Sequence, residues 1–377
     1  MDGRQDDYLD PALDDPELDT QASYRSDIEA RFDALLAPGL WRDFKTHLTK
    51  VGAELERDIA ELAKQDKVLR EDLRAHLHAE HDIRTVSQSD LDWADKELFD
   101  GKVCATDGTY SIYPLLGGIR VQIGVVATAY SNHRTEYVFY VSEQQVNSPD
   151  LDPISLLRGR QSENTVLSTL VTRALMAYKE RQVALERPEK WKLLNGPIAP
   201  GEMRTGLGRF RALEPCLDML GQVIDHKTAI GVIGTASHRD ITALGFGLHP
   251  MEYVMLWTWR GDLERYVQRA HFNPADEARF RSFVGKYGDH VAVGLFKAGT
   301  RAYVFQAHVD SFHEAAKLVI ADSRRQPIRS YPMLIDYADS ICTRMLASRD
   351  FQRQVEGKVA KSDIALVEMD EHTFRRR

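Results

Sequence analysis

The sequence predicts an α/β protein built around one mixed sheet, with helices beside the sheet and a long helical segment in front of it. Three observations lead to this class. Apolar residues recur at steps of three and four up to about residue 80, Val- and Ile-rich runs follow from residue 102, and helical and strand-like stretches alternate after residue 150. A mixed sheet accounts for the short connections between its first strands and the helical connections between later ones.

The first 20 residues carry most of the net charge of the 377-residue chain. They hold eight acidic residues and one arginine, a net charge of −7 out of the total of −8, so the remaining residues are almost neutral. Low hydrophobicity and repulsion between carboxylates predict a disordered acidic tail over residues 1–22. Such a tail either stays solvated, or docks on a partner or mimics DNA.

Residues 23–98 form the predicted helical region. Their apolar positions, among them Leu48, Leu55 and Leu62, are spaced for long amphipathic helices that break near Pro38. The narrow apolar stripe favours packing against another helix, which could belong to the same domain or to a second subunit.

The middle of the chain is predicted to fold into the sheet. Strands at 102–106, 119–130 and 137–141 have short connections, which indicates an antiparallel meander. A helix from Pro153 to about Ala184 follows, and the next strand leads to Asn195. The later elements are a helix at 212–224, strands at 229–233, 253–259, 291–295 and 302–306, and closing helices at 311–321 and 333–348.

Several classes of protein are excluded by features that the sequence lacks. We find no run of about 18 apolar residues that could span a membrane and no secretory signal, and three cysteines cannot build a disulfide framework, so we expect a cytoplasmic protein. No nucleotide-binding P-loop occurs, so any ATP-driven work must come from a partner. The common zinc motifs and the serine nucleophile elbow are missing as well.

Four polar residues stand at places where a sheet of this kind usually binds ligands. Asp107 is predicted to end the first strand, ahead of a loop at 111–118, and Asn195 to end the fourth strand. Glu163 lies in the helix after the meander, and Asp339 lies in the closing helix. Each has an ordinary alternative, namely a turn for the two strand ends and a solvated helix face for the two helical acids.

The order of these residues along the predicted topology is that of a ribonuclease H-like fold. An acid on the first strand, an acid on the first helix, a polar group after the fourth strand and an acid on the last helix make up this arrangement. Hard carboxylate oxygens can hold two divalent ions about 4 Å apart, as the hydrolysis of a phosphodiester requires. The constellation therefore predicts a two-metal site.

The same stretches resemble the motifs of the NurA nuclease family, in the family's order and over about residues 100–350. The matching segments are 105–109 (ATDGT), 193–198 (LLNGPI), 229–234 (AIGVIG) and 331–339 (YPMLIDYAD). The resemblance implies a nuclease domain at 99–350 with a C-terminal extension at 351–377. It also implies that the catalytic residues and ligands of Mn²⁺ or Mg²⁺ are Asp107, Glu163, Asn195 and Asp339.

The resemblance further implies a metal-dependent deoxyribonuclease that processes DNA ends as a homodimer with a HerA-type hexameric ATPase, in DNA repair or anti-phage defence. Asn195 departs from the family pattern, which has Asp there, and the lost negative charge weakens a metal ligand. An engineered change, a natural divergence and a shifted alignment all account for this asparagine. The alternatives are a catalytically weakened scaffold that binds DNA and regulates the ATPase, and a nuclease acting on RNA or branched DNA.

Overall fold

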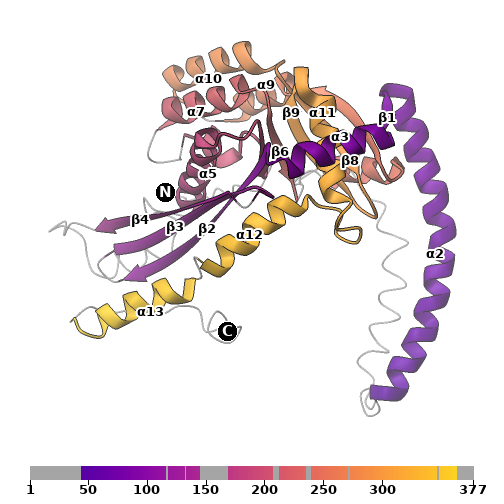
Figure 1. Ribbon diagram of the computed structural model, residues 1–377, viewed down its shortest axis with the longest axis horizontal. Helices are drawn as coiled ribbons and strands as arrows, with labels where there is room; N and C mark the ends of the chain where they lie inside the picture. Colours follow the sequence, from indigo (N-terminus) through magenta and orange to yellow (C-terminus); the bar gives the residue numbers. More distant parts are fainter. Residues whose placement is uncertain are drawn as a thin grey trace, which may run out of the picture. The chain divides into compact units, whose positions relative to one another are not determined.

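The computed structural model describes residues 44–115, 118–131, 133–144, 169–206, 212–234, 239–270, 272–345 and 348–362 (Figure 1). Residues 1–73 and 74–377 form two separate units, and the second unit contains the whole sheet. The predicted acidic tail and Glu163 lie outside the described residues.

A nine-stranded mixed sheet runs through the second unit in the order β1-β7-β8-β9-β6-β5-β2-β3-β4. Strands β2, β3 and β4 form the expected antiparallel meander, whereas β5 is parallel to β2 and to β6. This arrangement confirms the ribonuclease H-like fold predicted from the sequence. The strands are β1 (Ile83–Thr85), β2 (Val103–Leu115), β3 (Gly118–Thr128), β4 (Arg134–Gln144), β5 (Trp191–Asn195), β6 (Ala229–Ile233), β7 (Glu252–Thr258), β8 (Val291–Lys297) and β9 (Ala302–His308).

Helices cover both faces of this sheet (Figure 1). Helix α5 packs on β2 and β3 from one face, and α12 packs on the same two strands from the other. The described helices are α2 (Phe44–Glu80), α3 (Gln88–Phe99), α5 (Thr169–Glu186), α6 (Gly201–Arg204), α7 (Leu213–Asp225), α8 (Arg239–Leu244), α9 (Arg260–Arg269), α10 (Pro274–Tyr287), α11 (Phe312–Ser323), α12 (Met333–Met345) and α13 (Ser348–Val359), with 3₁₀ turns at Gly245–Gly247 and Val309–Ser311.

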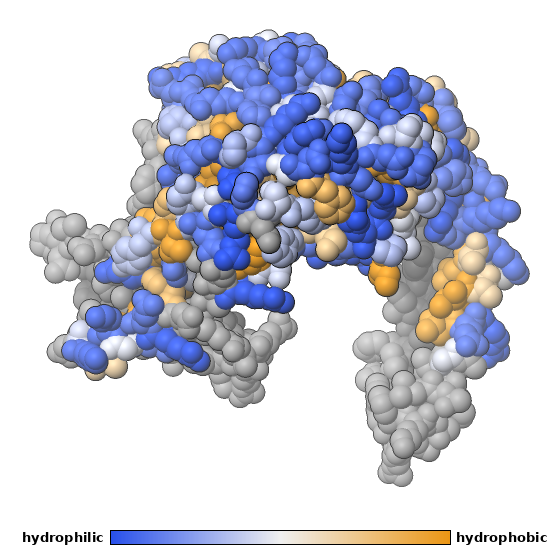
Figure 2. Space-filling view, in the orientation of Figure 1, coloured by the Kyte–Doolittle hydropathy of each residue, from blue (hydrophilic) through white to orange (hydrophobic). Residues whose placement is uncertain are grey.

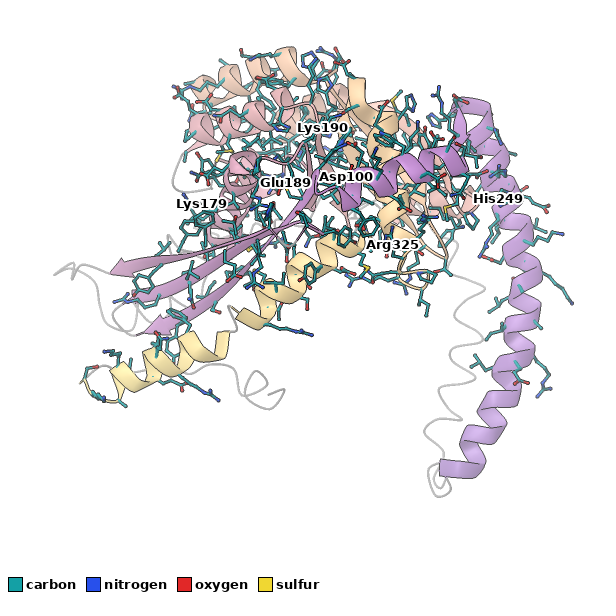
Figure 3. All side chains as sticks on the ribbon, viewed as in Figure 1. Asp100, Lys179, Glu189, Lys190, His249 and Arg325 are labelled. Carbon is teal, nitrogen blue, oxygen red and sulfur yellow. The ribbon has the colours of Figure 1, made fainter. Side chains whose placement is uncertain are left out.

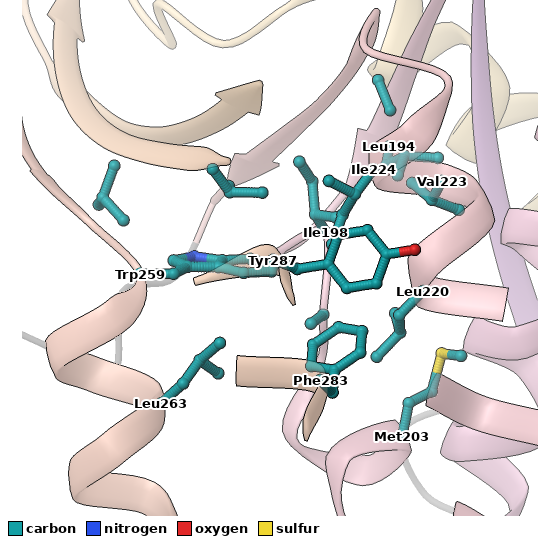
Figure 4. Packing of buried hydrophobic residues seen from close by; sticks show 14 of the residues in the cluster. Leu194, Ile198, Met203, Leu220, Val223, Ile224, Trp259, Leu263, Phe283 and Tyr287 are labelled. Carbon is teal, nitrogen blue, oxygen red and sulfur yellow. The ribbon is translucent and has the colours of Figure 1, made fainter. Parts of the chain in front are cut away.

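The larger core lies between the sheet and helices α7, α9 and α10 (Figure 4). Leu220 and Val223 of α7 meet Phe283 and Tyr287 of α10 there, because the apolar residues of each helix recur on one side. A second core lies against α3, α11 and α12. Since both faces are covered, β5 is buried along its length until its last residue, Asn195, which is exposed.

The structure corrects the predicted end of the first strand. Strand β2 continues through Asp107 and Gly108, and pairs with β3 as far as Leu115 opposite Gly118. Residues 111–115 therefore belong to this strand, and the loop predicted at 111–118 is wrong. Asp-Gly is a common turn sequence, and here the pairing with β3 holds it extended instead.

Helix α2 confirms the predicted N-terminal helical segment. Its apolar residues Leu55, Ile59, Leu62 and Leu69 are 54–61% exposed, and Figure 2 shows apolar surface along this helix. At its other end, in the second unit, Leu77 is buried in the core. Among the described residues, no helix has the length and hydrophobicity needed to cross a membrane.

The first turn of α12 is fixed by a buried aspartate at the end of α11. Asp322 accepts a hydrogen bond from the backbone N–H of Leu334 at 2.8 Å and another from the Tyr130 hydroxyl at 2.5 Å. Burial raises the pKa of Asp322 to about 6, although both hydrogen bonds oppose the shift. Arg325, near the start of α12 in Figure 3, pairs with Asp95 of α3 at 2.7 Å. Asp322 therefore ties the end of α11 to α12 and to the segment after β3, and Arg325 ties the segment after α11 to α3.

We expect Asp322→Asn to remove a pH dependence of stability. The folded-state pKa of about 6 lies above the ordinary value of 3.8, so the folded protein retains a proton that the unfolded chain releases, and stability falls as pH rises from about 4 to 6. Over this range the unfolding free energy of the wild type, measured by urea denaturation, should fall by up to about 3 kcal/mol more than that of the variant. Asp218→Asn, at an exposed residue of α7, should keep the wild-type profile. Parallel profiles for Asp322→Asn and the wild type would contradict this role.

Candidate metal centre

Asp107 stands where the parallel pairing between β2 and β5 stops. The two strands pair as far as Thr106 opposite Leu194, so Asp107 is the first residue of β2 beyond that ladder. Its side chain lies on the same face as that of Val126, its partner on β3, and Val126 packs against α12. The residue is only 3% exposed. Asp107 is therefore a buried carboxyl that faces α12 at the end of β5.

Asn195 reaches Asp107 from the end of β5. Its Nδ2 donates a hydrogen bond to Asp107 Oδ1 at 2.8 Å, and its Oδ1 accepts one from the Tyr331 hydroxyl at 2.9 Å. The chain then turns at Gly196, whose φ of 94° suits glycine and whose N–H donates to the carbonyl oxygen of Val232 at 2.8 Å. The expected turn is present, and the asparagine side chain also contacts the predicted site.

Asp339 approaches Asp107 from helix α12. It is an exposed residue, and its carboxyl lies close enough to that of Asp107 to disfavour its ionisation. Burial raises the pKa of Asp107 to about 7, with a further contribution from Asp339 and an opposing one from the Asn195 hydrogen bond. The structure thus places Asp107 beside Asn195 and within electrostatic range of Asp339, while Glu163 falls outside the described residues.

A further acid, Glu180 of α5, lies behind β2 and escapes sequence reasoning. A Cβ on Gly108 would come within 2.5 Å of Glu180 Oε1, so the glycine makes room for this carboxyl. Burial raises the pKa of Glu180 to about 8, and the Arg181 guanidinium 3.1 Å away opposes this shift. Arg181 also donates hydrogen bonds to the carbonyl oxygens of Pro197 and Ile198, in the loop after Asn195. The one sequence signal was a glycine inside a strand, which often marks a close approach.

The donor atoms at this edge suit a hard divalent cation. Carboxylate and amide oxygens are the ligands that Mg²⁺ and Mn²⁺ prefer, and a cation relieves the repulsion between two ionised carboxylates. Within the described residues, neither Asp107 nor Asp339 forms an ion pair with a basic side chain. As the side chains stand, no group of three or more His, Cys, Asp and Glu in that part of the chain is arranged to hold a metal ion. The fit therefore rests on two carboxyls and one amide.

Solved nuclease structures match most of the chain, although no family model and no curated protein matches it. The NurA nuclease from Sulfolobus solfataricus is 12% identical with a TM-score of 0.45, covering 83% of this chain and 97% of that one. A structure of NurA with manganese is 10% identical with a TM-score of 0.48, covering 82% and 98%. The catalytic domain of human endonuclease V is 14% identical with a TM-score of 0.28, covering 78% and 98%. The chain thus resembles NurA structures, the family whose motifs its sequence resembles.

Gly108→Ala should destabilise the protein, because the new Cβ would lie 2.5 Å from Glu180 Oε1 and 2.7 Å from Met176 Cγ. Overpacking of a filled site typically costs about 1–3 kcal/mol. The matched control is Gly285→Ala in α10, where nothing lies within 4 Å of the added Cβ. That change should keep or raise stability by up to about 1 kcal/mol. Urea denaturation of the three proteins measures the difference, and equal stability of Gly108→Ala and the wild type would refute the close approach of Glu180.

Proposed function

We propose that this protein is a divalent-metal-dependent deoxyribonuclease, in which Asp107, Asn195 and Asp339 bind Mn²⁺ or Mg²⁺. The observation that carries the proposal is the buried Asp107 carboxyl at the end of β5, which accepts a hydrogen bond from Asn195 and whose ionisation Asp339 disfavours. A carboxyl that is buried beside a second acid, as Asp107 is, is costly to ionise without a cation. The class of reaction is the hydrolysis of a phosphodiester, which such oxygen ligands support when a metal is bound.

The chain's own residues would divide the work in the following way. A divalent ion held by these residues would activate a water and would stabilise the charge that develops on the leaving oxygen. Asp107 is buried and held by Asn195, so its position is fixed before substrate arrives. Asn195 and Asp339 are exposed, so a phosphodiester can approach the cluster from their side.

The proposal keeps Glu163 as a fourth ligand and keeps a two-metal arrangement, both on the strength of the motif resemblance. Glu180 does not replace Glu163 in this proposal. Its carboxyl is buried beside Arg181 and contacts β2 from the face opposite to the Asp107 side chain.

DNA is the substrate that we propose, and exposed cations follow Asp339 along the chain. They include Arg344 on α12, Arg353 and Lys358 on α13, and Lys361 just after that helix. Such cations contribute affinity for phosphates at any sequence. The proposed context is DNA-end processing in the cytoplasm as a homodimer with a HerA-type hexameric ATPase, in repair or anti-phage defence. Its support is the ordered NurA-like motifs and the lack of a P-loop in this sequence.

Asp107→Ala should abolish cleavage of linear DNA in the presence of Mn²⁺. Loss of a group that only supports a metal ligand already costs about 10- to 100-fold, so loss of the buried ligand itself should exceed about 100-fold. A gel assay for end resection and internal cutting measures the effect.

Two further variants make this test specific. Asp107→Asn keeps the shape of the side chain and removes only its charge, so it should lose activity as well. Asp218→Ala, on the exposed side of α7, should cleave at the wild-type rate. Circular dichroism checks that each variant is folded, and undiminished cleavage by folded Asp107→Ala would overturn the catalytic assignment.

Asn195 favours a second candidate, a NurA-like scaffold of low activity that binds DNA and regulates the ATPase of its partner. An amide leaves the metal site with one negative charge fewer than the family's aspartate would give. If metal binding is weak, cleavage is slow, and the protein would act mainly by binding DNA and its partner.

Asn195→Asp should raise Mn²⁺-dependent cleavage about tenfold or more, because the restored charge strengthens a metal ligand. The rate of cleavage is measured at several Mn²⁺ concentrations. Asp218→Asn, which changes the net charge by one unit in the opposite direction, is measured in parallel as a control. A lack of cleavage by both the wild type and Asn195→Asp would favour the scaffold over the nuclease.

A further inference from the structure

The Tyr331 hydroxyl contacts two acceptors but has only one proton to donate. Its oxygen lies 2.9 Å from Asn195 Oδ1 and 3.0 Å from the carbonyl oxygen of Val232. A hydroxyl donates one hydrogen bond and can accept others. Tyr331 can therefore donate to either partner, and when it donates to Val232 it is free to accept a hydrogen bond from Asn195.

The surroundings of Tyr331 permit both arrangements. The carbonyl oxygen of Val232 already accepts the N–H of Gly196 at 2.8 Å, so it is satisfied whether or not Tyr331 donates to it. Tyr331 is 3% exposed, and its ring packs edge-on against Tyr303, with 5.1 Å between the ring centroids. The hydroxyl thus stays in place while the direction of its hydrogen bond changes.

The Asn195 amide has the same shape in both of its orientations, but it presents opposite polarity to Asp107. In the structure its Nδ2 donates to the Asp107 carboxyl, which stabilises a carboxylate that has no cation beside it. A half-turn of the amide would direct Oδ1 towards Asp107 and Nδ2 towards Tyr331. Two oxygens facing each other are favourable only when a cation lies between them.

We propose that Tyr331 is a positioning residue that allows Asn195 to present its N–H to Asp107 in the metal-free protein and its amide oxygen to a bound divalent cation. This inference rests on the proposed function, because it requires a metal at Asp107. In the metal-bound arrangement Tyr331 accepts from Asn195 Nδ2 and donates to Val232. One hydroxyl therefore satisfies both orientations of the amide.

An aspartate at position 195 would use Tyr331 differently. A carboxylate has no proton to donate, so Tyr331 could only donate to it, with or without metal. That hydrogen bond stabilises the carboxylate most when no cation shares its charge. The Tyr331 hydroxyl should therefore favour metal binding when residue 195 is Asn, and should not favour it when residue 195 is Asp.

The test is a calorimetric titration of Mn²⁺ into four full-length proteins: the wild type, Tyr331→Phe, Asn195→Asp and the double variant. In the wild-type background the metal-bound state uses two hydrogen bonds of the hydroxyl and the metal-free state uses one. Tyr331→Phe should therefore weaken Mn²⁺ binding by about 2- to 10-fold. In the Asn195→Asp background the same change should leave binding unchanged or tighten it.

Tyr303→Phe is the matched control, because that hydroxyl donates to the carbonyl oxygen of Arg329 and its ring packs on Tyr331. It should leave the Mn²⁺ affinity unchanged. Urea denaturation of the metal-free proteins separates a loss of stability from a loss of affinity. Weakened binding by a similar factor in both backgrounds would show a merely structural role for Tyr331, and unchanged binding in the wild-type background would also overturn the inference.

The failure of this inference can be told apart from the failure of the proposed function. If Asn195→Asp binds Mn²⁺ and the wild type does not, Asn195 offers the metal no oxygen, and the inference is wrong while Asp107 and Asp339 remain metal ligands. If neither protein binds Mn²⁺, the proposed nuclease function fails, and the inference fails with it.

Discussion

The site depends above all on how the buried carboxyl of Asp107 is accommodated. Burying a carboxylate costs several kcal/mol unless polar groups surround it. Asn195 and the backbone of Gly108 give it hydrogen bonds, whereas Asp339 opposes its ionisation. Asn195 reaches it from the last position of β5, just before the chain turns away at Gly196. The position at which β5 ends therefore affects the ionisation of Asp107.

Much of this arrangement could be predicted because it is encoded locally. Strand β6 begins at Ala229 and ends at Ile233, as expected from its apolar run, and β5 ends at Asn195 ahead of Gly-Pro. Apolar runs bounded by turn residues depend on neighbours in the sequence. Once the order of strands and helices is known, the topology alone brings Asp107 and Asp339 to one place, without knowledge of any side-chain contact.

The features that could not be predicted depend on contacts between distant segments. Strand β2 continues through Asp107 because β3 pairs with it there. An Asp-Gly sequence gives no sign of this pairing. Glu180 was missed because only the missing Cβ of Gly108 distinguishes it from other helical acids. Tyr331 reaches Asn195 across 136 residues of sequence. Single buried polar contacts leave no periodic pattern, so periodicity cannot find them.

Asparagine and aspartate are similar in size, yet at position 195 they have opposite effects on the ionisation of Asp107. Asparagine donates an N–H to that carboxyl, which stabilises the metal-free protein. Aspartate cannot donate, and it would add a charge beside a group whose ionisation is already disfavoured by burial and by Asp339. An aspartate therefore couples the integrity of the site more closely to bound metal. The asparagine loosens that coupling, because its hydrogen bond holds Asp107 in place without a metal, and its amide would bind a cation more weakly than a carboxylate would.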